Sequence, residues 1–343
     1  MNGAATLIAL VICLLLGACA SPRIVPPAAE ALAPRLTATE ARMPDGYRLP
    51  LRVWPATPAH GNQPAIVALG LHGFNDYAHA FAPLATSLAQ GGITTYAVDQ
   101  RGFGATALAG RWHGSEQLAA DLTALTELLR DRYPQARLYL VGESMGGAVV
   151  ISALSRGSLT VDGAVLIAPA VWSRDAMPWY QRLGLDTLVG IAPGLRLTGK
   201  GVRIQPSDNI DMLRAMSADP LVIKATRVDA LWGITNLMDQ AMAKVSNLPG
   251  PLLLLYGERD EIIPRGAFCR MLDRLPSHTD DVRLVLFRGG WHMLPRDLQG
   301  QRVHADVIAW MEDPRGPLPS GEESAPRSKR TREFCTSSSR KTR

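Results

Sequence analysis

The stretch that decides the fold is "LYLVGESMGGAVVISAL", residues 138–154. Four apolar residues lead into the glycine-flanked "GESMG" of residues 142–146, and a run of small and apolar residues follows. This order predicts a buried strand that turns sharply into a helix. The pattern G-x-S-x-G in that setting is typical of a strained turn that exposes a serine Oγ. We therefore expect Ser144 to be a nucleophile.

Short apolar runs recur on both sides of this turn, with helical stretches between them. Most are continuously apolar, as strands covered on both faces are. Leucines repeat every three or four residues over 115–134, which predicts a helix there. Alternating strands and helices predict an α/β fold with a mostly parallel central sheet and helices on both faces. The expected strands are residues 48–55, 65–73, 93–102, 137–144, 163–171, 251–260 and 282–290.

Residues 172–245 interrupt this alternation because they contain no strong strand. A segment of that length is too long for a simple connection. We expect a helical cap inserted above the sheet. Its apolar side chains either pack the cap onto the sheet or line slots for an acyl chain. They are Met177, Trp179, Tyr180, Leu183, Leu188, Met212, Met216, Leu231, Trp232, Leu237, Met238 and Met242.

Two later strand ends carry the partners that a serine nucleophile needs. A serine hydroxyl reacts only when a base takes its proton and a third group orients that base. "LLLLYGERDEIIP" puts Asp260 beyond one predicted strand, and "LVLFRGGWHMLP" puts His292 beyond the next. The chain order Ser144, Asp260, His292 is that of a known serine triad. We expect His292 to be the base and Asp260 the orienting acid, with Glu261 as the alternative acid.

The loop "LGLHGFND", residues 69–76, follows an earlier predicted strand and is expected to complete the site. Acyl transfer passes through an oxyanion that needs two hydrogen-bond donors. Gly73 allows the backbone to approach a ligand closely. We expect the backbone N–H groups of Phe74 and Met145 to be the donors, and His72 to be a structural loop residue.

These motifs together resemble the monoacylglycerol lipase and lysophospholipase branch of the α/β-hydrolases, the serine aminopeptidase S33 type. The resemblance covers about residues 45–312 and rests on "HGFNDY", "VDQRGFG", "LVGESMGG", "ADPLV", "LMDQAM", "YGERDEIIP" and "GGWHMLP". Glu143 stands where many members have His. The resemblance implies an α/β-hydrolase fold with a helical cap. It assigns the nucleophile, acid, base and two oxyanion donors to Ser144, Asp260, His292, Phe74 and Met145.

By the same resemblance the activity is hydrolysis of a single-acyl-chain lipid ester, either a lysophospholipid or a monoacylglycerol. The family works without a metal or cofactor, and nothing in the sequence implies an obligate protein partner. Two alternatives stay open. One is a peptidase, small-ester or thioester hydrolase of the same fold, since specificity is set outside the triad. The other is a non-catalytic lipid-binding lipoprotein.

The N-terminus reads as an export signal. Residues 4–18 are apolar but span only about 22 Å as a helix, short of a bilayer core of about 30 Å. We expect residues 1–18 to be a signal peptide. "LGAC", residues 16–19, resembles a bacterial lipobox, which implies lipidation of Cys19 and anchoring in a bacterial envelope membrane, favouring the outer one, facing the periplasm. Residues 19–44 are rich in Pro and Ala and predict a tether.

The N-terminal signal leaves alternatives, because residues 1–6 carry no Lys or Arg. A simple secretory signal, an uncleaved anchor or an unexported leader would also fit an apolar run of this length.

The charge distribution and the cysteine spacing indicate whether the protein binds nucleic acid or zinc and whether it has a disulfide framework. The net charge is +5, and eight Lys/Arg against three Glu after Pro314 account for all of it. Residues 1–313, which include the expected hydrolase domain at 45–313, are thus neutral in sum, which argues against a nucleic-acid partner. We expect residues 314–343 to be a disordered, solvated basic tail. Cys13, Cys19, Cys269 and Cys335 form no C-x-x-C pair, which predicts neither a disulfide framework nor a zinc site.

Overall fold

The computed structural model describes residues 24–337, apart from residue 30 and segments 58–62, 200, 202–203 and 277–280. A nine-stranded sheet runs through this part of the chain in the order β1-β2-β3-β5-β4-β6-β7-β10-β11. From β5 to β11 neighbouring strands are parallel, and β3 joins β5 antiparallel. All seven predicted strands are present, and the predicted α/β fold is confirmed. The strands are β1 (Arg35–Leu36), β2 (Glu40–Arg42), β3 (Arg48–Trp54), β4 (Ile66–Leu71), β5 (Ile93–Val98), β6 (Arg137–Glu143), β7 (Gly163–Ile167), β10 (Leu252–Gly257) and β11 (Val282–Phe287).

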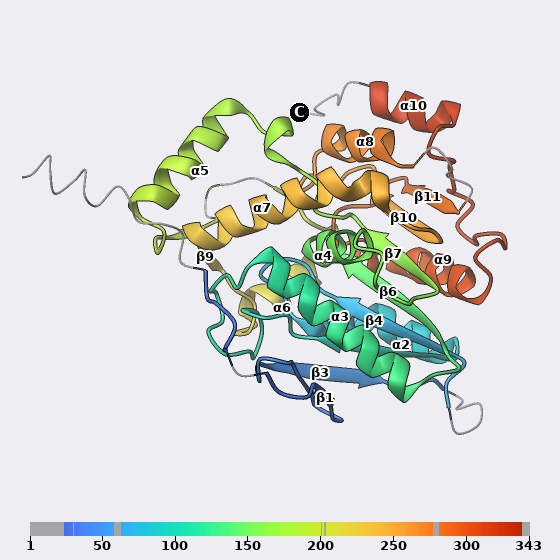
Figure 1. Ribbon diagram of the computed structural model, residues 1–343. Helices are drawn as coiled ribbons and strands as arrows, with labels where there is room; N and C mark the ends of the chain where they lie inside the picture. The colour runs from blue at the N-terminus through green and yellow to red at the C-terminus, as the bar shows by residue number, and fades with distance from the viewer. Residues whose placement is uncertain are drawn as a thin grey trace, which may run out of the picture.

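Two apolar cores lie on opposite faces of the sheet because successive strand residues point to opposite sides. In β10, Leu252 and Leu254 enter one core, and Leu253 and Leu255 enter the other. The first core is closed by α3 (Ser115–Arg132), α4 (Met145–Leu154) and α8 (Arg265–Arg274), and the second by α2 (Ala82–Gln90) and α9 (Gly300–Glu312). Figure 1 shows these helices on either side of the strands.

The segment between β7 and β10 forms an insert that packs α7 against α4. As expected it is largely helical, but β8 and β9 form an antiparallel ribbon that the sequence did not predict. α5 packs against α7 and lies at the outer edge of the molecule (Figure 1). The elements are η2 (Arg174–Ala176), α5 (Trp179–Ile191), β8 (Arg196–Thr198), α6 (Ile210–Ala218), β9 (Ala225–Arg227), α7 (Val228–Lys244) and η3 (Val245–Asn247).

The prediction of a tether over 19–44 is wrong for its second half. β2 pairs with β3, and β1 pairs with β2, so these residues extend the sheet. Ala41 and Met43 are fully buried in the first core. Ala41 lies in β2 and Met43 directly follows it. Two buried residues in a Pro- and Ala-rich segment were too weak a pattern to predict a strand. Residues 1–23, with the predicted signal peptide and Cys19, lie outside the described residues. No helix within the described residues has the length and apolarity needed to cross a bilayer.

The prediction of a disordered tail is wrong for residues 314–337. Ser324 N–H donates to the Leu284 carbonyl at 2.8 Å, and Glu323 forms a bridge with Val285. The tail therefore covers part of the exposed edge of β11, a position that proteins commonly protect. Some of its charges are paired, for example Glu323 with Arg283 at 2.5 Å. Composition alone could not reveal these partners.

The tail ends in α10 (Lys329–Thr336), which a disulfide joins to α8. Cys269 and Cys335 form this bond with an S–S distance of 2.01 Å. The sequence predicted no disulfide framework, and this expectation was wrong for Cys269 and Cys335. The two cysteines are separated by 66 residues, so their pairing depends on how α10 packs and not on any local spacing.

Candidate active site

Ser144 stands at the turn between β6 and α4 in a strained backbone conformation. Its φ of 50° and ψ of −111° lie outside the regions that a serine normally adopts. The flanking glycines make the turn possible. A Cβ on Gly146 would lie 1.9 Å from the carbonyl oxygen of Leu71, and one on Gly142 would lie 2.6 Å from that of Gly146. The sequence pattern thus reflects a steric requirement.

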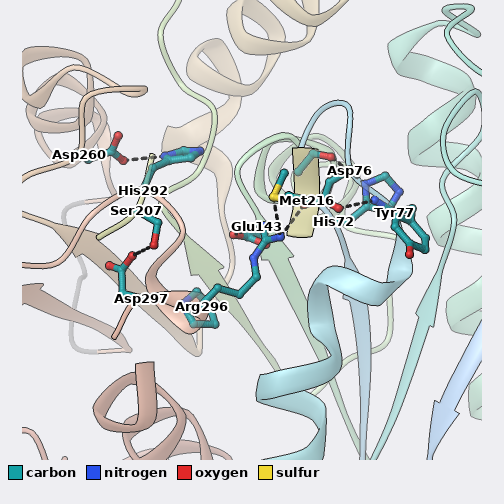
Figure 2. Close-up of polar contacts among 12 residues, drawn as sticks. His72, Asp76, Tyr77, Glu143, Ser207, Met216, Asp260, His292, Arg296 and Asp297 are labelled. Atoms are coloured by element: carbon teal, nitrogen blue, oxygen red, sulfur yellow. Dashed lines mark hydrogen bonds and ion pairs between the residues drawn. The ribbon is translucent and has the colours of Figure 1, made fainter. Parts of the chain in front are cut away.

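The structure brings His292 and Asp260 together from the loops after β11 and β10. His292 Nδ1 lies 2.8 Å from Asp260 Oδ2 (Figure 2). Since a carboxylate only accepts, Nδ1 carries the proton and Nε2 is left to act as an acceptor. The backbone N–H groups of Ile262 and Ile263 donate to Asp260 Oδ1 and fix that carboxylate. Burial lowers the pKa of His292, but the charge and hydrogen bond of Asp260 outweigh it and leave the pKa raised.

The alternative acid, Glu261, points elsewhere. Its Oε2 accepts a hydrogen bond from the backbone N–H of Gln205 at 2.7 Å. Asp260 is therefore the carboxylate that contacts His292. In the described part of the chain no hydrogen bond joins Ser144 Oγ to His292. Such bonds are often long before substrate binds and tighten in the reactive complex.

The two predicted oxyanion donors flank Ser144. A Cβ on Gly73 would lie 3.5 Å from the Ser144 Cβ, so the loop that carries Phe74 approaches the nucleophile turn. Met145 is the first residue of α4, where helix N–H groups lack intrahelical acceptors. Among the described residues, neither the Phe74 nor the Met145 backbone N–H donates to a protein group. Both remain available for an oxyanion.

His72 has a structural part, as predicted. Its ring is fully buried, and its Nε2 accepts the backbone N–H of Gln100 at 2.9 Å. Its Nδ1 lies 2.7 Å from the Gly73 carbonyl and so donates to it. Burial lowers the pKa of His72, in keeping with a neutral ring. The ring holds the loop of residues 72–76 against the end of β5.

The sequence analysis missed Arg296, in η4 (Leu294–Arg296), four residues after His292. Its guanidinium is 6% exposed and donates from Nη1 to Asp76 Oδ2 at 2.7 Å and from Nη2 to Glu143 Oε1 at 3.3 Å. Burial lowers its pKa, but the two carboxylates outweigh that effect and the pKa is raised. The only sequence signal was a charged residue directly after the apolar "MLP".

Asp297 also escaped the sequence analysis. Its Oδ2 accepts the backbone N–H of Trp291 at 2.7 Å, and its Oδ1 accepts the hydroxyl of the fully buried Ser207 at 2.6 Å (Figure 2). Burial raises the pKa of Asp297 to about 6. Because Ser207 belongs to the insert, this pair joins the insert to the loop that carries His292.

A cavity of about 180 Å³ lies between α6 and η1 (Ala78–Phe81), and Asp76 and Arg296 line part of it. Two of the methionines named in the sequence analysis, Met212 and Met216, contribute to it, so part of the insert lines space rather than packing on the sheet. The lining residues are Asp76, Tyr77, His79, Ala80, Pro83, Met212, Ala215, Met216, Asp219, Val222 and Arg296.

Comparisons with known proteins agree with the fold. The family described as "Serine aminopeptidase, S33" matches residues 62–299. A monoacylglycerol lipase of Mycolicibacterium smegmatis is 28% identical over 282 residues, covering 78% of this chain and 93% of the relative. A human monoglyceride lipase is 25% identical over 267 residues, 74% and 82% of the two chains.

Solved structures give the same result. A soluble variant of monoglyceride lipase from Saccharomyces cerevisiae superposes with a TM-score of 0.69 at 18% identity, over 85% of this chain and 98% of that one. The Paleococcus ferrophilus monoacylglycerol lipase gives 0.64 at 23% identity, over 77% and 98%. These similarities establish the α/β-hydrolase fold. Since the family match spans well over half of its length, the chain belongs to the serine aminopeptidase S33 family of α/β-hydrolases.

Proposed function

We propose that the protein is a serine carboxylester hydrolase that cleaves single-acyl-chain lipid esters, a lysophospholipid or a monoacylglycerol, through an acyl-enzyme. The observation that carries the proposal is the Asp260–His292 pair, which leaves His292 Nε2 as an acceptor at the same sheet edge as the strained Ser144 turn. The names of the similar lipases support the substrate class.

In this mechanism His292 Nε2 takes the Ser144 proton while Oγ attacks the ester carbonyl. The backbone N–H groups of Phe74 and Met145 stabilise the oxyanion. His292 then gives the proton to the leaving alcohol as the ester C–O bond breaks, and the acyl group stays on Ser144. A water that His292 deprotonates attacks this acyl-enzyme, which releases the fatty acid and restores Ser144. Asp260 stabilises the imidazolium at both steps.

The same proposal puts the protein at a bacterial envelope membrane, anchored through a lipidated Cys19. Five residues lead from Cys19 to Ile24, a reach of at most about 17 Å. Val25 N–H donates to the Trp112 carbonyl. The Trp112 ring packs against Gly233 of α7, and α7 in turn packs against α5. Hence the chain enters the fold on the side of the insert.

Two further observations support this placement. On α5, Trp179, Tyr180, Leu183 and Ile191 are between 59% and 68% exposed, a concentration of apolar surface that suits contact with lipid. The Cys269–Cys335 disulfide suits an oxidising compartment outside the cytosol. Mass spectrometry of the N-terminal peptide of the membrane-bound protein should find a chain that begins at an acylated Cys19. An unmodified Cys19 or a peptide that begins at Met1 would contradict the lipid anchor.

Ser144→Ala tests the chemistry. We expect hydrolysis of a short p-nitrophenyl ester and labelling by a fluorophosphonate to fall to background, while the melting temperature stays within a few degrees of the wild-type value, because a buried hydroxyl is replaced by a smaller group at one position. Release of fatty acid from lysophospholipids and monoacylglycerols by the wild-type protein tests the substrate class. Undiminished ester turnover by Ser144→Ala would refute the mechanism.

An aminopeptidase is the second candidate, because the family is described by that activity. Acyl transfer to serine is common to esters and amides, and specificity is set by residues outside the triad. Comparing kcat/KM on an aminoacyl p-nitroanilide with kcat/KM on a long-chain p-nitrophenyl ester separates the two. Faster cleavage of the anilide would replace the lipid assignment.

A further inference from the structure

Three loops must keep a fixed relation for this site to work. They are the oxyanion loop (residues 72–76), the nucleophile turn (residues 142–146) and the histidine loop (residues 288–297). They come from β4, β6 and β11, and in sequence Arg296 is 220 residues from Asp76 and 153 from Glu143. The backbone of each loop therefore cannot align the other two.

Arg296 contacts all three loops. It belongs to the histidine loop, its Nη1 reaches Asp76 at the end of the oxyanion loop, and its Nη2 reaches Glu143, the residue before Ser144 (Figure 2). Both carboxylates are 5% exposed, so the pairs form away from water, where charge-assisted hydrogen bonds hold geometry well. Asp76 Oδ1 also accepts the backbone N–H of Tyr77 and so anchors its own loop.

We propose that Arg296 is a positioning residue whose guanidinium ties the oxyanion loop, through Asp76, and the nucleophile turn, through Glu143, to the histidine loop. The planar fork is needed because it directs two donors along separate lines to two carboxylates, which a lysine ammonium on one flexible stem does not reproduce. This inference rests on the serine hydrolase proposal, since it assigns a task at the same site.

The charged groups around Arg296 also influence the pKa of His292. Asp260 and Glu143 raise the pKa of His292, and Arg296 lowers it. Asp297 lies on the same loop as His292, and the charge of Glu143 acts on both Asp297 and His72. Removing the negative charge of Glu143 should therefore lower the pKa of His292 and move the acid limb of the kcat/KM profile to lower pH.

Arg101 supplies a matched control. Its guanidinium is 1% exposed and also bridges two carboxylates, Asp45 and Asp121, each at 2.6 Å. Its hydrogen-bond partners in the described part of the chain are these two carboxylates, and neither is proposed for catalysis. A Lys substitution at this position therefore measures what the loss of a buried fork does to the fold alone.

The experiment compares Arg296→Lys, Glu143→Gln and Arg101→Lys in the full chain, using a short p-nitrophenyl ester. We expect Arg296→Lys to lower kcat roughly 10- to 100-fold with KM changed less than about threefold, because reacting groups are misaligned. Its acid limb should stay in place, since the positive charge remains. Arg101→Lys should lower the melting temperature but keep kcat within about twofold. Glu143→Gln should lower kcat, because the charged partner of Arg296 Nη2 is lost, and should move the acid limb to lower pH.

A kcat for Arg296→Lys that stays as close to wild type as that of Arg101→Lys would overturn the proposal, since the fork would then serve the fold only. An unchanged kcat in Glu143→Gln would overturn it as well, because this isosteric variant removes the charge that ties the nucleophile turn to Arg296. It also keeps the test open if Arg296→Lys does not fold. Failure of the serine hydrolase proposal looks different, because the wild-type protein would then neither react with a fluorophosphonate nor turn over the ester.

Discussion

At the scale of single residues, protonation of His292 sets the pH range of the proposed reaction. The ring must be neutral to accept the Ser144 proton, and its folded-state pKa lies above the ordinary 6.5. Activity should therefore rise with pH through that raised pKa. The contribution of this ring to stability changes with pH in the opposite direction. The protonated ring stabilises the fold below about pH 6.5, and this contribution is lost as pH rises through the folded-state pKa.

Asp260→Asn tests this account. The variant removes the charge that raises the pKa of His292 while burial still lowers it, so the acid limb of kcat/KM should move to lower pH. We also expect kcat to fall roughly 10⁴-fold, because an amide that donates to Nδ1 favours the wrong tautomer. A pH titration of ester hydrolysis measures both effects. As a control, Glu261→Gln, which lies outside the His292 contact, should leave kcat near the wild-type value.

At the scale of elements, α5 is the feature that the sequence analysis interpreted least well. Its apolar residues were expected to pack the insert or to line an acyl slot, yet Trp179 is 68% exposed and Leu183 is 59% exposed. By contrast, Leu237 and Met242 of α7 are buried, as the packing alternative required. Large apolar residues exposed to water on one helix indicate a surface that binds a partner. Because the proposed substrate is a lipid, we propose that this partner is a membrane.

Leu183→Asp should therefore weaken activity at a membrane and leave activity on a soluble substrate unchanged. We expect roughly tenfold weaker binding to anionic and zwitterionic phospholipid vesicles and slower hydrolysis of vesicle-borne substrate, because a charge replaces apolar contact area. Turnover of a soluble short ester should not change. Gln90→Asp adds the same charge on α2, across the sheet, and is the control. Equal vesicle binding by both variants would contradict a role of α5 at the membrane.

At the scale of the whole molecule, the C-terminal segment closes the fold. The tail pairs with β11, and Phe334 of α10 packs on Tyr256, whose ring stacks on Phe268 at a centroid distance of 4.0 Å. Tyr256 lies in β10, the strand that ends near Asp260, so the tail supports the strand behind the proposed acid. The disulfide fixes this arrangement covalently.

Removing the disulfide should cost stability rather than chemistry. Cys335→Ser opens a closed loop of 66 residues, and we expect the free energy of unfolding to fall by about 2–4 kcal/mol. Equilibrium denaturation in guanidinium, with and without reductant, measures the difference. The variant should be insensitive to reductant, whereas the wild-type protein should lose stability when reduced. Identical midpoints for both proteins in oxidising buffer would contradict the stabilising role.

Features encoded by neighbouring residues could be predicted before the structure was known. Apolar runs placed all seven main strands, and most of these runs are continuous because a strand buried on both faces has no polar position. The glycines around Ser144 marked the nucleophile turn, since a Cβ at either flanking position would collide with backbone. The order of strand ends was enough to expect His292 beside Asp260, because parallel strands deliver their carboxyl ends to one edge of the sheet.

Contacts between segments far apart in the chain could not be predicted and became visible in the folded protein. The Arg296 cluster, the Cys269–Cys335 bond and the pairing of the tail with β11 each depend on partners far apart in the chain. A charged or sulfur-containing side chain carries no local pattern that names its partner. From sequence alone such residues are therefore predicted to be solvated or unpaired. Their partners come within bonding distance when the sheet, the insert and the C-terminal segment pack together.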